Sequence, residues 1–232
     1  TGARNWATYY GGTVSGNESG RGVACDNSGN VYLCGNTYST TGIASGGFMN
    51  AFSGFEDAFL VKFSSAGTRL WATYYGGSSY TRGHGVATDA AGNVYIVGQT
   101  LSPFGIASGG FQNGYGGGSN NDAFLAAFNS AGNRLWGTYC GGSQDDEGFG
   151  VAADGMGNVY LAGNTVSTTN IASPGGFLNA LTTARDGFLV QYNATTGARN
   201  WGTYYGGTGN TYGINVAADA SGNSYLAGYT LS

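Results

Sequence analysis

The sequence predicts an all-β fold, a β-propeller whose four-stranded antiparallel blades repeat every 65 residues, with about three and a half blades in this chain. Three observations predict it: the composition, an internal repeat, and the order of strand-like segments within each repeat. Of the 232 residues, 46 are Gly, 33 are Phe, Trp or Tyr, and only 20 are charged (12 acidic and 8 basic). This composition is typical of short strands joined by tight turns.

The repeat is marked by its tryptophans. They stand 65 residues apart, each inside the motif W-x-T-Y-x-G-G, at Trp6, Trp71, Trp136 and Trp201. A second motif, close to G-V-A-x-D-x-x-G-N-V-Y-L-x-G, recurs four times, and a third, close to D-A-F-L-V-K-F, recurs three times. Motifs held in a constant register indicate a repeat architecture.

Each unit contains four strand candidates, as residues 22–76 illustrate. The first strand is the G-V-A run, and a D-x-x-G-N turn leads into the second strand, which ends near residue 35. A loop of about 20 residues precedes the third strand at 57–63, and a Gly-containing turn leads to the fourth, which carries Trp71. Short turns that alternate with longer loops favour an antiparallel meander, and a stack of meanders forms a propeller.

The chain is expected to be one propeller segment over residues 1–232. Its parts are the outer strand of an incomplete blade at 1–12, blades at 22–76, 85–141 and 150–206, and the first two strands of an incomplete blade at 213–232. Propellers close with about four to eight blades. Further blades are therefore expected from the same longer chain or from a second copy, or a partner donates the missing strand.

Side-chain size along the unit agrees with blades arranged around an axis. The first strand offers Gly, Val, Ala and Thr, which suit a crowded innermost position, whereas the fourth strand carries Trp and Tyr, which need the wider gaps at the rim. The third strand is apolar on both sides, as a strand packed between two neighbouring blades must be. A solenoid is the alternative, but its repeats are commonly about 20 to 50 residues long with one or two strands.

The combined motif resembles a known family. The pattern G-V-A-x-D-x-x-G-N-V-Y-L-x-G-x-T, then G-I-A-S-G-G-F-x-N, then D-A-F-L-V-K-F-x-x-x-G-x-R-L-W-x-T-Y-Y-G-G resembles the SBBP beta-propeller repeat of secreted and surface proteins of bacteria, which is similar to NHL and WD40-type blades. The resemblance covers the whole chain and implies an extracellular or cell-surface protein. The family has no agreed activity, so the resemblance implies no functional residues.

Composition excludes two classes of partner. With one Lys, seven Arg and a net charge of -4, the chain cannot supply the basic stripe that a nucleic-acid binder needs. No stretch approaches the roughly 20 apolar residues that span a bilayer, so membrane insertion is not expected.

Ligand binding is expected at the end of the blades that carries the longer loops. The loops before each first strand, at 13–21, 78–85, 143–150 and 208–215, differ most between repeats. A constant scaffold with varied loops is typical of a recognition surface, although unconstrained loops also drift. The candidate ligand-binding residues are Tyr80, Arg82, His84, Asp145, Asp146, Glu147 and Tyr212. Aromatic rings and carboxylates suit a sugar or another surface ligand.

The loops between second and third strands vary less. Each repeats an Ile and a Phe, as in G-I-A-S-G-G-F at 42–48, and we expect both residues to anchor the loop on its blade.

No catalytic residues, metal site or cofactor are expected. Three adjacent carboxylates at 145–147 suggest calcium, but the cluster has no alternating ligand spacing and is not repeated, so we favour a solvated loop and leave calcium open. The recurring Asp26, Asp89, Asp154 and Asp219 are interpreted as turn residues that accept backbone N–H groups. One His excludes a metal site built on imidazoles, and no G-x-S-x-G motif is present.

Three cysteines are too few for a disulfide scaffold. Cys25, Cys34 and Cys140 stand where other repeats carry Thr, Val, Ala or Tyr, so each is interpreted as a packing residue. Cys25 and Cys34 lie on partner strands, and a bridge between them remains an alternative.

The expected function is that of a noncatalytic extracellular propeller segment of a larger bacterial surface or fibrous protein. It would act in adhesion or ligand binding, glycans included, or as a rigid scaffold. One alternative is a polysaccharide lyase or hydrolase, although one His, one Lys and one acidic cluster are a small supply of acid–base groups. Another is a building block of a homopolymeric assembly.

Overall fold

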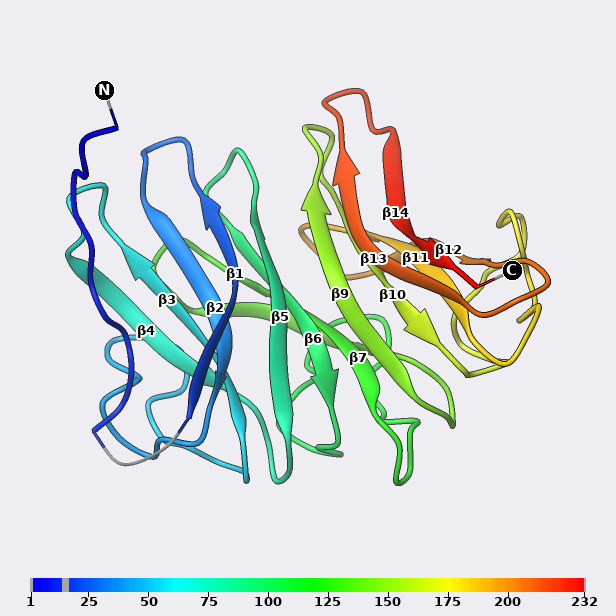
Figure 1. The fold of residues 1–232 in the computed structure, drawn as a ribbon, viewed down its shortest axis with the longest axis horizontal. Coiled ribbons are helices and arrows are strands. Elements are labelled where there is room, and N and C mark those ends of the chain that lie inside the picture. The colour runs from blue at the N-terminus through cyan, green and yellow to red at the C-terminus, as the bar shows by residue number, and fades with distance from the viewer. Residues whose placement is uncertain (1, 14–16, 232) are drawn as a thin grey trace.

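The structure is a computed structural model that describes residues 2–13 and 17–231. In these residues the strands form three four-stranded antiparallel sheets and one two-stranded sheet, each paired in chain order (Figure 1). No helix in this part of the chain is long and apolar enough to cross a membrane. The strands are β1 (Glu18–Cys25), β2 (Val31–Thr37), β3 (Asp57–Phe63), β4 (Arg69–Tyr75), β5 (Thr81–Thr88), β6 (Val94–Thr100), β7 (Asp122–Phe128), β8 (Arg134–Cys140), β9 (Asp146–Ala153), β10 (Asn158–Thr165), β11 (Asp186–Asn193), β12 (Arg199–Tyr205), β13 (Thr211–Ala218) and β14 (Ser224–Thr230).

The first strands of successive sheets lie against one another. β1 contacts β5, β5 contacts β9, and β9 contacts β13, and Figure 1 shows these four strands in succession. The sheets therefore share a line of first strands and direct their fourth strands outward. This is the arrangement of propeller blades, and the predicted all-β propeller of four-stranded blades is confirmed.

The turn between the first and second strands is built on an aspartate. Asp26 Oδ1 accepts the backbone N–H groups of Ser28 and Asn30, both at 2.9 Å, and Oδ2 accepts the Asn30 amide at 2.8 Å and the Tyr32 hydroxyl at 3.1 Å. The same kind of network recurs at Asp89, Asp154 and Asp219. The interpretation of these residues as turn residues is confirmed.

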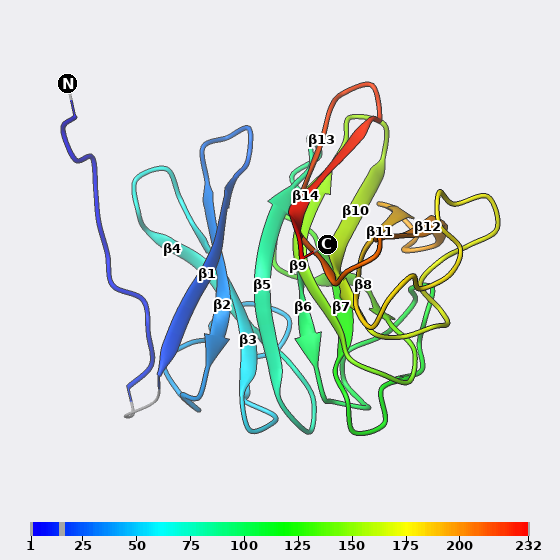
Figure 2. The ribbon, with the colours of Figure 1, turned by 45° about the vertical axis from the view of Figure 1, so that its right-hand side comes forward.

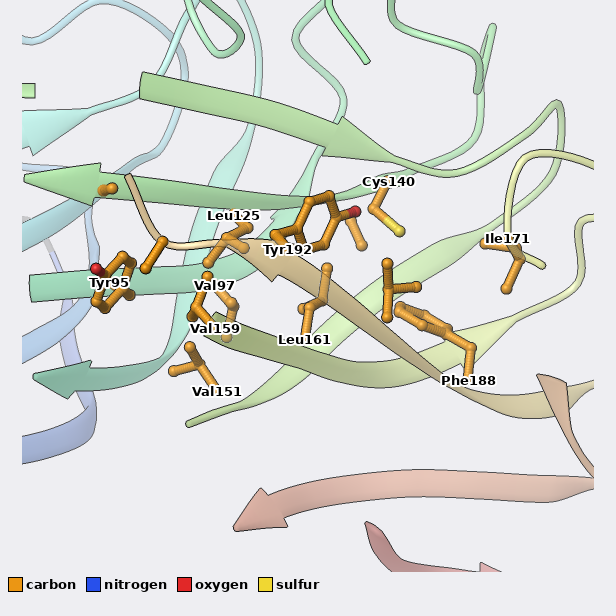
Figure 3. Close-up of a cluster of buried hydrophobic side chains, with 14 of the residues drawn as sticks. Tyr95, Val97, Leu125, Cys140, Val151, Val159, Leu161, Ile171, Phe188 and Tyr192 are labelled. Atoms are coloured by element: carbon orange, nitrogen blue, oxygen red, sulfur yellow. The ribbon is translucent and has the colours of Figure 1, made fainter. Parts of the chain in front are cut away.

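The hydrophobic core lies between neighbouring sheets. In the largest cluster, Val97 and Leu125 of the second sheet pack with Leu161 and Phe188 of the third, and all four are fully buried (Figure 3). Burial of such side chains contributes about 1.5–3 kcal/mol each. Contact between blades is therefore a main source of stability.

Trp71 of β4 and Trp136 of β8 each reach the next blade. Trp71 Nε1 donates to the Ser130 carbonyl at 3.0 Å, and Trp136 Nε1 donates to the Ala194 carbonyl at 2.9 Å. These carbonyls belong to the turns between the third and fourth strands of the following sheets. The 65-residue spacing thus positions a contact that joins one repeat to the next.

Residues 2–12 differ from the expected outer strand, because the structure assigns no strand there. The segment runs along one side of the first sheet (Figure 2). Trp6 Nε1 donates to the Ser65 carbonyl at 3.0 Å, and the Tyr10 hydroxyl donates to the Ile43 carbonyl at 2.9 Å, as Tyr75 does to Ile106 at 2.6 Å. The segment makes the contacts of a fourth strand toward the next blade, but the described residues provide no third strand with which it could pair.

The loops between second and third strands are held by their isoleucines. Ile43, Ile106 and Ile171 are fully buried. The expected second anchor behaves differently, because Phe48 is 40% exposed and its ring lies 4.5 Å from the Arg134 guanidinium of the following blade. The Phe therefore contacts the neighbouring blade as well as solvent.

The three cysteines are free thiols. Cys34 and Cys140 are buried, as expected of packing residues, whereas Cys25 is exposed. The alternative of a bridge between Cys25 and Cys34 is not realised. In Figure 3, Cys140 lies beside Tyr192 in the core between the second and third sheets.

Candidate ligand-binding face

A β-bulge in every first strand determines where the candidate residues lie. In β5, Arg82 pairs with Gln99 and Gly83 with Gly98, but the next pair joins Gly85 to Val97, so His84 has no cross-strand partner. The strand thus begins several residues before the G-V-A run. Five candidates expected in loops lie within first strands: Arg82, His84, Asp146, Glu147 and Tyr212.

Tyr80 and Arg82 line a cavity on the loop face, the end of the sheets that carries the loops leading into each first and third strand. Its volume is about 210 Å³, and Gln99, Leu101 and Asn121 complete its lining. Tyr80 is 39% exposed and stacks on Phe55, with ring centroids 5.6 Å apart and an interplanar angle of 22°. The site therefore places aromatic surface beside amide and guanidinium hydrogen-bonding groups.

Arg82 is held by a buried carboxylate. Its Nε lies 2.7 Å from Glu56 Oε2, and Glu56 is only 1% exposed. The amide of Asn36 donates to the other oxygen of Glu56. This chain of contacts joins the first sheet to the second and fixes the guanidinium, because a buried carboxylate without its partner would be costly.

The three acidic candidates point in different directions. Asp145 Oδ1 accepts the backbone N–H of Asn121 at 3.0 Å and its side-chain amide at 3.2 Å, which fixes one wall of the cavity. Glu147 lies 3.3 Å from Arg185.

Asp146 is fully buried, accepts hydrogen bonds from Thr165, Ser167 and the Gly142 N–H, and is not available to a ligand on the loop face. Burial raises the pKa of Asp146 to about 6.

The remaining two candidates lie away from this cavity. Tyr212 stacks on Tyr229 at 4.6 Å, and the Arg185 guanidinium lies 5.8 Å from the Tyr212 ring, so Glu147 and Tyr212 share one arginine. His84 faces the line of first strands and stacks on Phe149 at 4.9 Å. The seven candidates thus do not form one site, and only Tyr80 and Arg82 share a cavity wall.

Sequence reasoning missed several residues of the cavity. Asn121 stands directly before the constant Asp of the third strand, where the other blades carry Glu56 and Arg185. Gln99 stands where other second strands carry Asn36, Asn164 and Tyr229. Variation at these two positions within otherwise constant motifs is the signal that could have identified them.

The described residues contain no group of three or more His, Cys, Asp or Glu side chains placed to hold a metal ion. The divergence of residues 145–147 explains why that acidic run does not assemble one.

The comparisons with known proteins agree with the fold. The SBBP beta-propeller repeat matches residues 70–105, 135–171 and 200–232. Each match starts in a fourth strand and extends through the following first and second strands, so it covers the connection from one blade to the next.

A curated protein, regulatory protein FlaEY of Caulobacter vibrioides, is 26% identical over 114 residues, which are 49% of this chain. The matched part is only 12% of that protein's length. The motifs, the sheets and the family matches together show that this chain carries three repeats of the SBBP beta-propeller repeat family.

Proposed function

We propose that this chain is a noncatalytic propeller segment of an extracellular or cell-surface protein, and that its loop face binds a polyhydroxylated ligand such as a glycan. The observation that carries the proposal is the stacked Phe55–Tyr80 pair beside the cavity lined by Arg82, Gln99 and Asn121. Phe55 is 65% exposed, so aromatic surface is accessible at the site. Rings cover the apolar face of a sugar, while amides and a guanidinium bond its hydroxyl groups.

The lining favours binding over hydrolysis. None of the five lining residues is a carboxylate or an imidazole. Two carboxylates contact the lining residues: Glu56 is buried and paired with Arg82, and Asp145 accepts the backbone N–H and the side-chain amide of Asn121. Glycoside cleavage commonly requires two carboxyl groups facing the substrate.

The test is a glycan array followed by calorimetry on the glycans retained. We expect Tyr80→Ala to weaken binding by about tenfold, because an aromatic contact contributes about 0.5–1.5 kcal/mol beyond the area it buries. Tyr9→Ala is the matched control, since Tyr9 is fully exposed in the N-terminal segment. A blank array, or equal affinity of the Tyr80 variant and the wild type, would contradict the proposal.

A scaffold role is the second candidate, and one observation favours it. Tyr75 is fully buried against Phe124 of the next blade, at 5.3 Å, whereas Tyr205 at the equivalent position is 53% exposed. Phe177 is likewise 76% exposed. This face suits a further blade, from the same longer chain or from a second copy. Native mass spectrometry that finds only a 23.6 kDa monomer would exclude self-assembly of this segment.

A further inference from the structure

The bulge residues of the first strands gather in a second concave surface, separate from the loop-face cavity. The ladder between first and second strands shifts register at the same place in all four sheets. The residue left without a cross-strand partner is Arg21, His84, Phe149 or Ile214, in chain order. A bulge re-aims the side chain of its extra residue and is common beside functional sites.

These four residues line one groove of about 250 Å³, which we call the axial groove. Glycines allow the first strands to approach closely there: a β-carbon at Gly85 would lie 2.6 Å from the Phe149 carbonyl oxygen. Because these glycine-containing strands lie close together, the side chains at the equivalent bulge positions of successive strands meet in one groove. The groove is independent of the proposed glycan site, with which it shares no lining residue.

The axial groove is positively charged within a protein of net charge -4. Its lining includes Arg21 and His84 and no Asp or Glu. Arg21 is exposed, and the ion pairs of the described residues join Lys62 to Asp26, Arg82 to Glu56 and Arg185 to Glu147. Among residues 2–13 and 17–231, no acidic side chain pairs with the Arg21 guanidinium, whose N–H donors suit a ligand.

The His84 ring is also fixed in its orientation and its tautomer. Its Nδ1 lies 2.9 Å from the Gly148 carbonyl, which can only accept, so Nδ1 carries a proton and Nε2 is the second ring nitrogen. The ring is stacked on Phe149 with an interplanar angle of 9°, which restricts its rotation.

Burial lowers the pKa of His84, and the charges of Arg21 and Arg82 lower it further, while the bond to Gly148 and the charge of Glu56 oppose them. An anion beside Arg21 would offset its charge and favour a second N–H donor on the imidazole.

We propose that the axial groove binds a small oxyanion group, a carboxylate or a phosphate, between the Arg21 guanidinium and His84 Nε2. Arginine forms two parallel hydrogen bonds to such a group, and the stacked His84 and Phe149 rings form the wall beside it. The site is built by the bulges of different blades, so it exists only where those blades are assembled.

The test uses the chain's single histidine, whose C2–H proton gives one resonance in an NMR titration. Sodium phosphate and sodium acetate are titrated in separate arms at constant ionic strength, with sodium chloride as the reference. We expect saturable shifts of the His84 resonance and a higher His84 pKa in the saturated protein than in chloride. Preference for one arm identifies whether phosphate or carboxylate is the better ligand.

Variants decide whether the groove is responsible. Arg21→Gln should weaken binding of the anion at least tenfold. Arg21→Lys should give an intermediate affinity, because it keeps the charge but loses the two parallel N–H donors of the guanidinium. Arg4→Gln changes the net charge by the same amount and should bind the anion like the wild type. Thermal melting checks that each variant folds. Shifts that do not saturate in either arm, or equal affinities of Arg21→Gln and Arg4→Gln, would overturn the assignment.

Discussion

Two buried carboxyl groups at the contact between the second and third blades should make stability fall as the pH rises. Asp122 and Asp146 are both fully buried. A β-carbon at Gly141 would lie 2.8 Å from Asp122 Oδ1 and 2.5 Å from Asp146 Oδ2, so the two groups flank the same small space. Asp122 Oδ2 accepts the Gly116 N–H at 2.8 Å, whereas Oδ1 has no hydrogen-bond partner. Asp122 is therefore the group suited to hold a proton.

Burial raises the pKa of Asp122 to about 7, and the charge of Asp146 adds to the rise. An unfolded Asp titrates near 3.9, so the folded state binds more protons than the unfolded state between about pH 4 and pH 7. The free energy of unfolding should then decrease across that window and level off above it. From these two pKa values, Asp122 alone accounts for a loss of about 2.5 kcal/mol between pH 5 and pH 8.

The perturbation is Asp122→Asn, which keeps the shape and removes the titration. Urea denaturation followed by tryptophan fluorescence at pH 5, 6, 7 and 8, with EDTA present, gives the stability of variant and wild type. The free energy of unfolding of the variant should rise relative to that of the wild type by about 2.5 kcal/mol between pH 5 and pH 8. Asp219→Asn is a control without a slope: hydrogen bonds from Asn223, Ser221 and Tyr225 lower the pKa of Asp219, so this carboxyl is ionised in both the folded and the unfolded chain from pH 5 to pH 8, and the difference between this variant and the wild type should stay constant there. A difference between Asp122→Asn and wild type that stays constant from pH 5 to pH 8 would refute the reasoning.

Three further predictions follow from the contacts between blades and from the thiols. Gly85→Ala should destabilise the chain by about 1–3 kcal/mol, because the added methyl group is overpacked against the Phe149 carbonyl. Gly114→Ala is the control: its β-carbon would meet no atom within 4 Å, so stability should change little. The midpoints of urea denaturation measure both effects. Arg82→Met should destabilise the chain by about 1–3 kcal/mol at neutral pH because it leaves buried Glu56 without its cation, and Arg4→Met is its control. Equal urea midpoints for the two variants would argue against a structural role for the Glu56–Arg82 pair. Ellman's reagent should modify only the exposed Cys25 in the folded chain, because burial raises the pKa of Cys34 and of Cys140 to about 12. In denaturant it should modify all three thiols. Modification of only one thiol in denaturant would indicate a bridge between the other two.

The repeat motifs predicted the strands well because each motif carries a local cause. The Asp26 network closes its turn within seven residues, and the spacing of Trp71 from Trp136 reflects one contact that both residues make with the following blade. Such features are readable because neighbouring residues, or residues one period apart, create them.

The candidate site was less predictable because it depends on how one blade sits against another. The pair of Glu56 and Arg82 joins two sheets, and no spacing rule links those residues before the sheets are placed. The bulge at His84 moves that residue from the expected loop into β5, because register depends on the partner strand as well as on the local sequence. Arg21 was overlooked for the same reason.

The hydrogen bonds from the Trp6, Trp71 and Trp136 indoles to the turns of the following blades also bear on how such chains change in length. Because donor and acceptor belong to successive copies of one motif, gain or loss of a whole 65-residue unit recreates every bond with a new neighbour. Gain of a part of a unit would move the indole out of reach of its carbonyl. Duplication of complete units is thus the change in chain length that this architecture tolerates best. The number of blades can vary among related proteins while the contacts between blades stay the same.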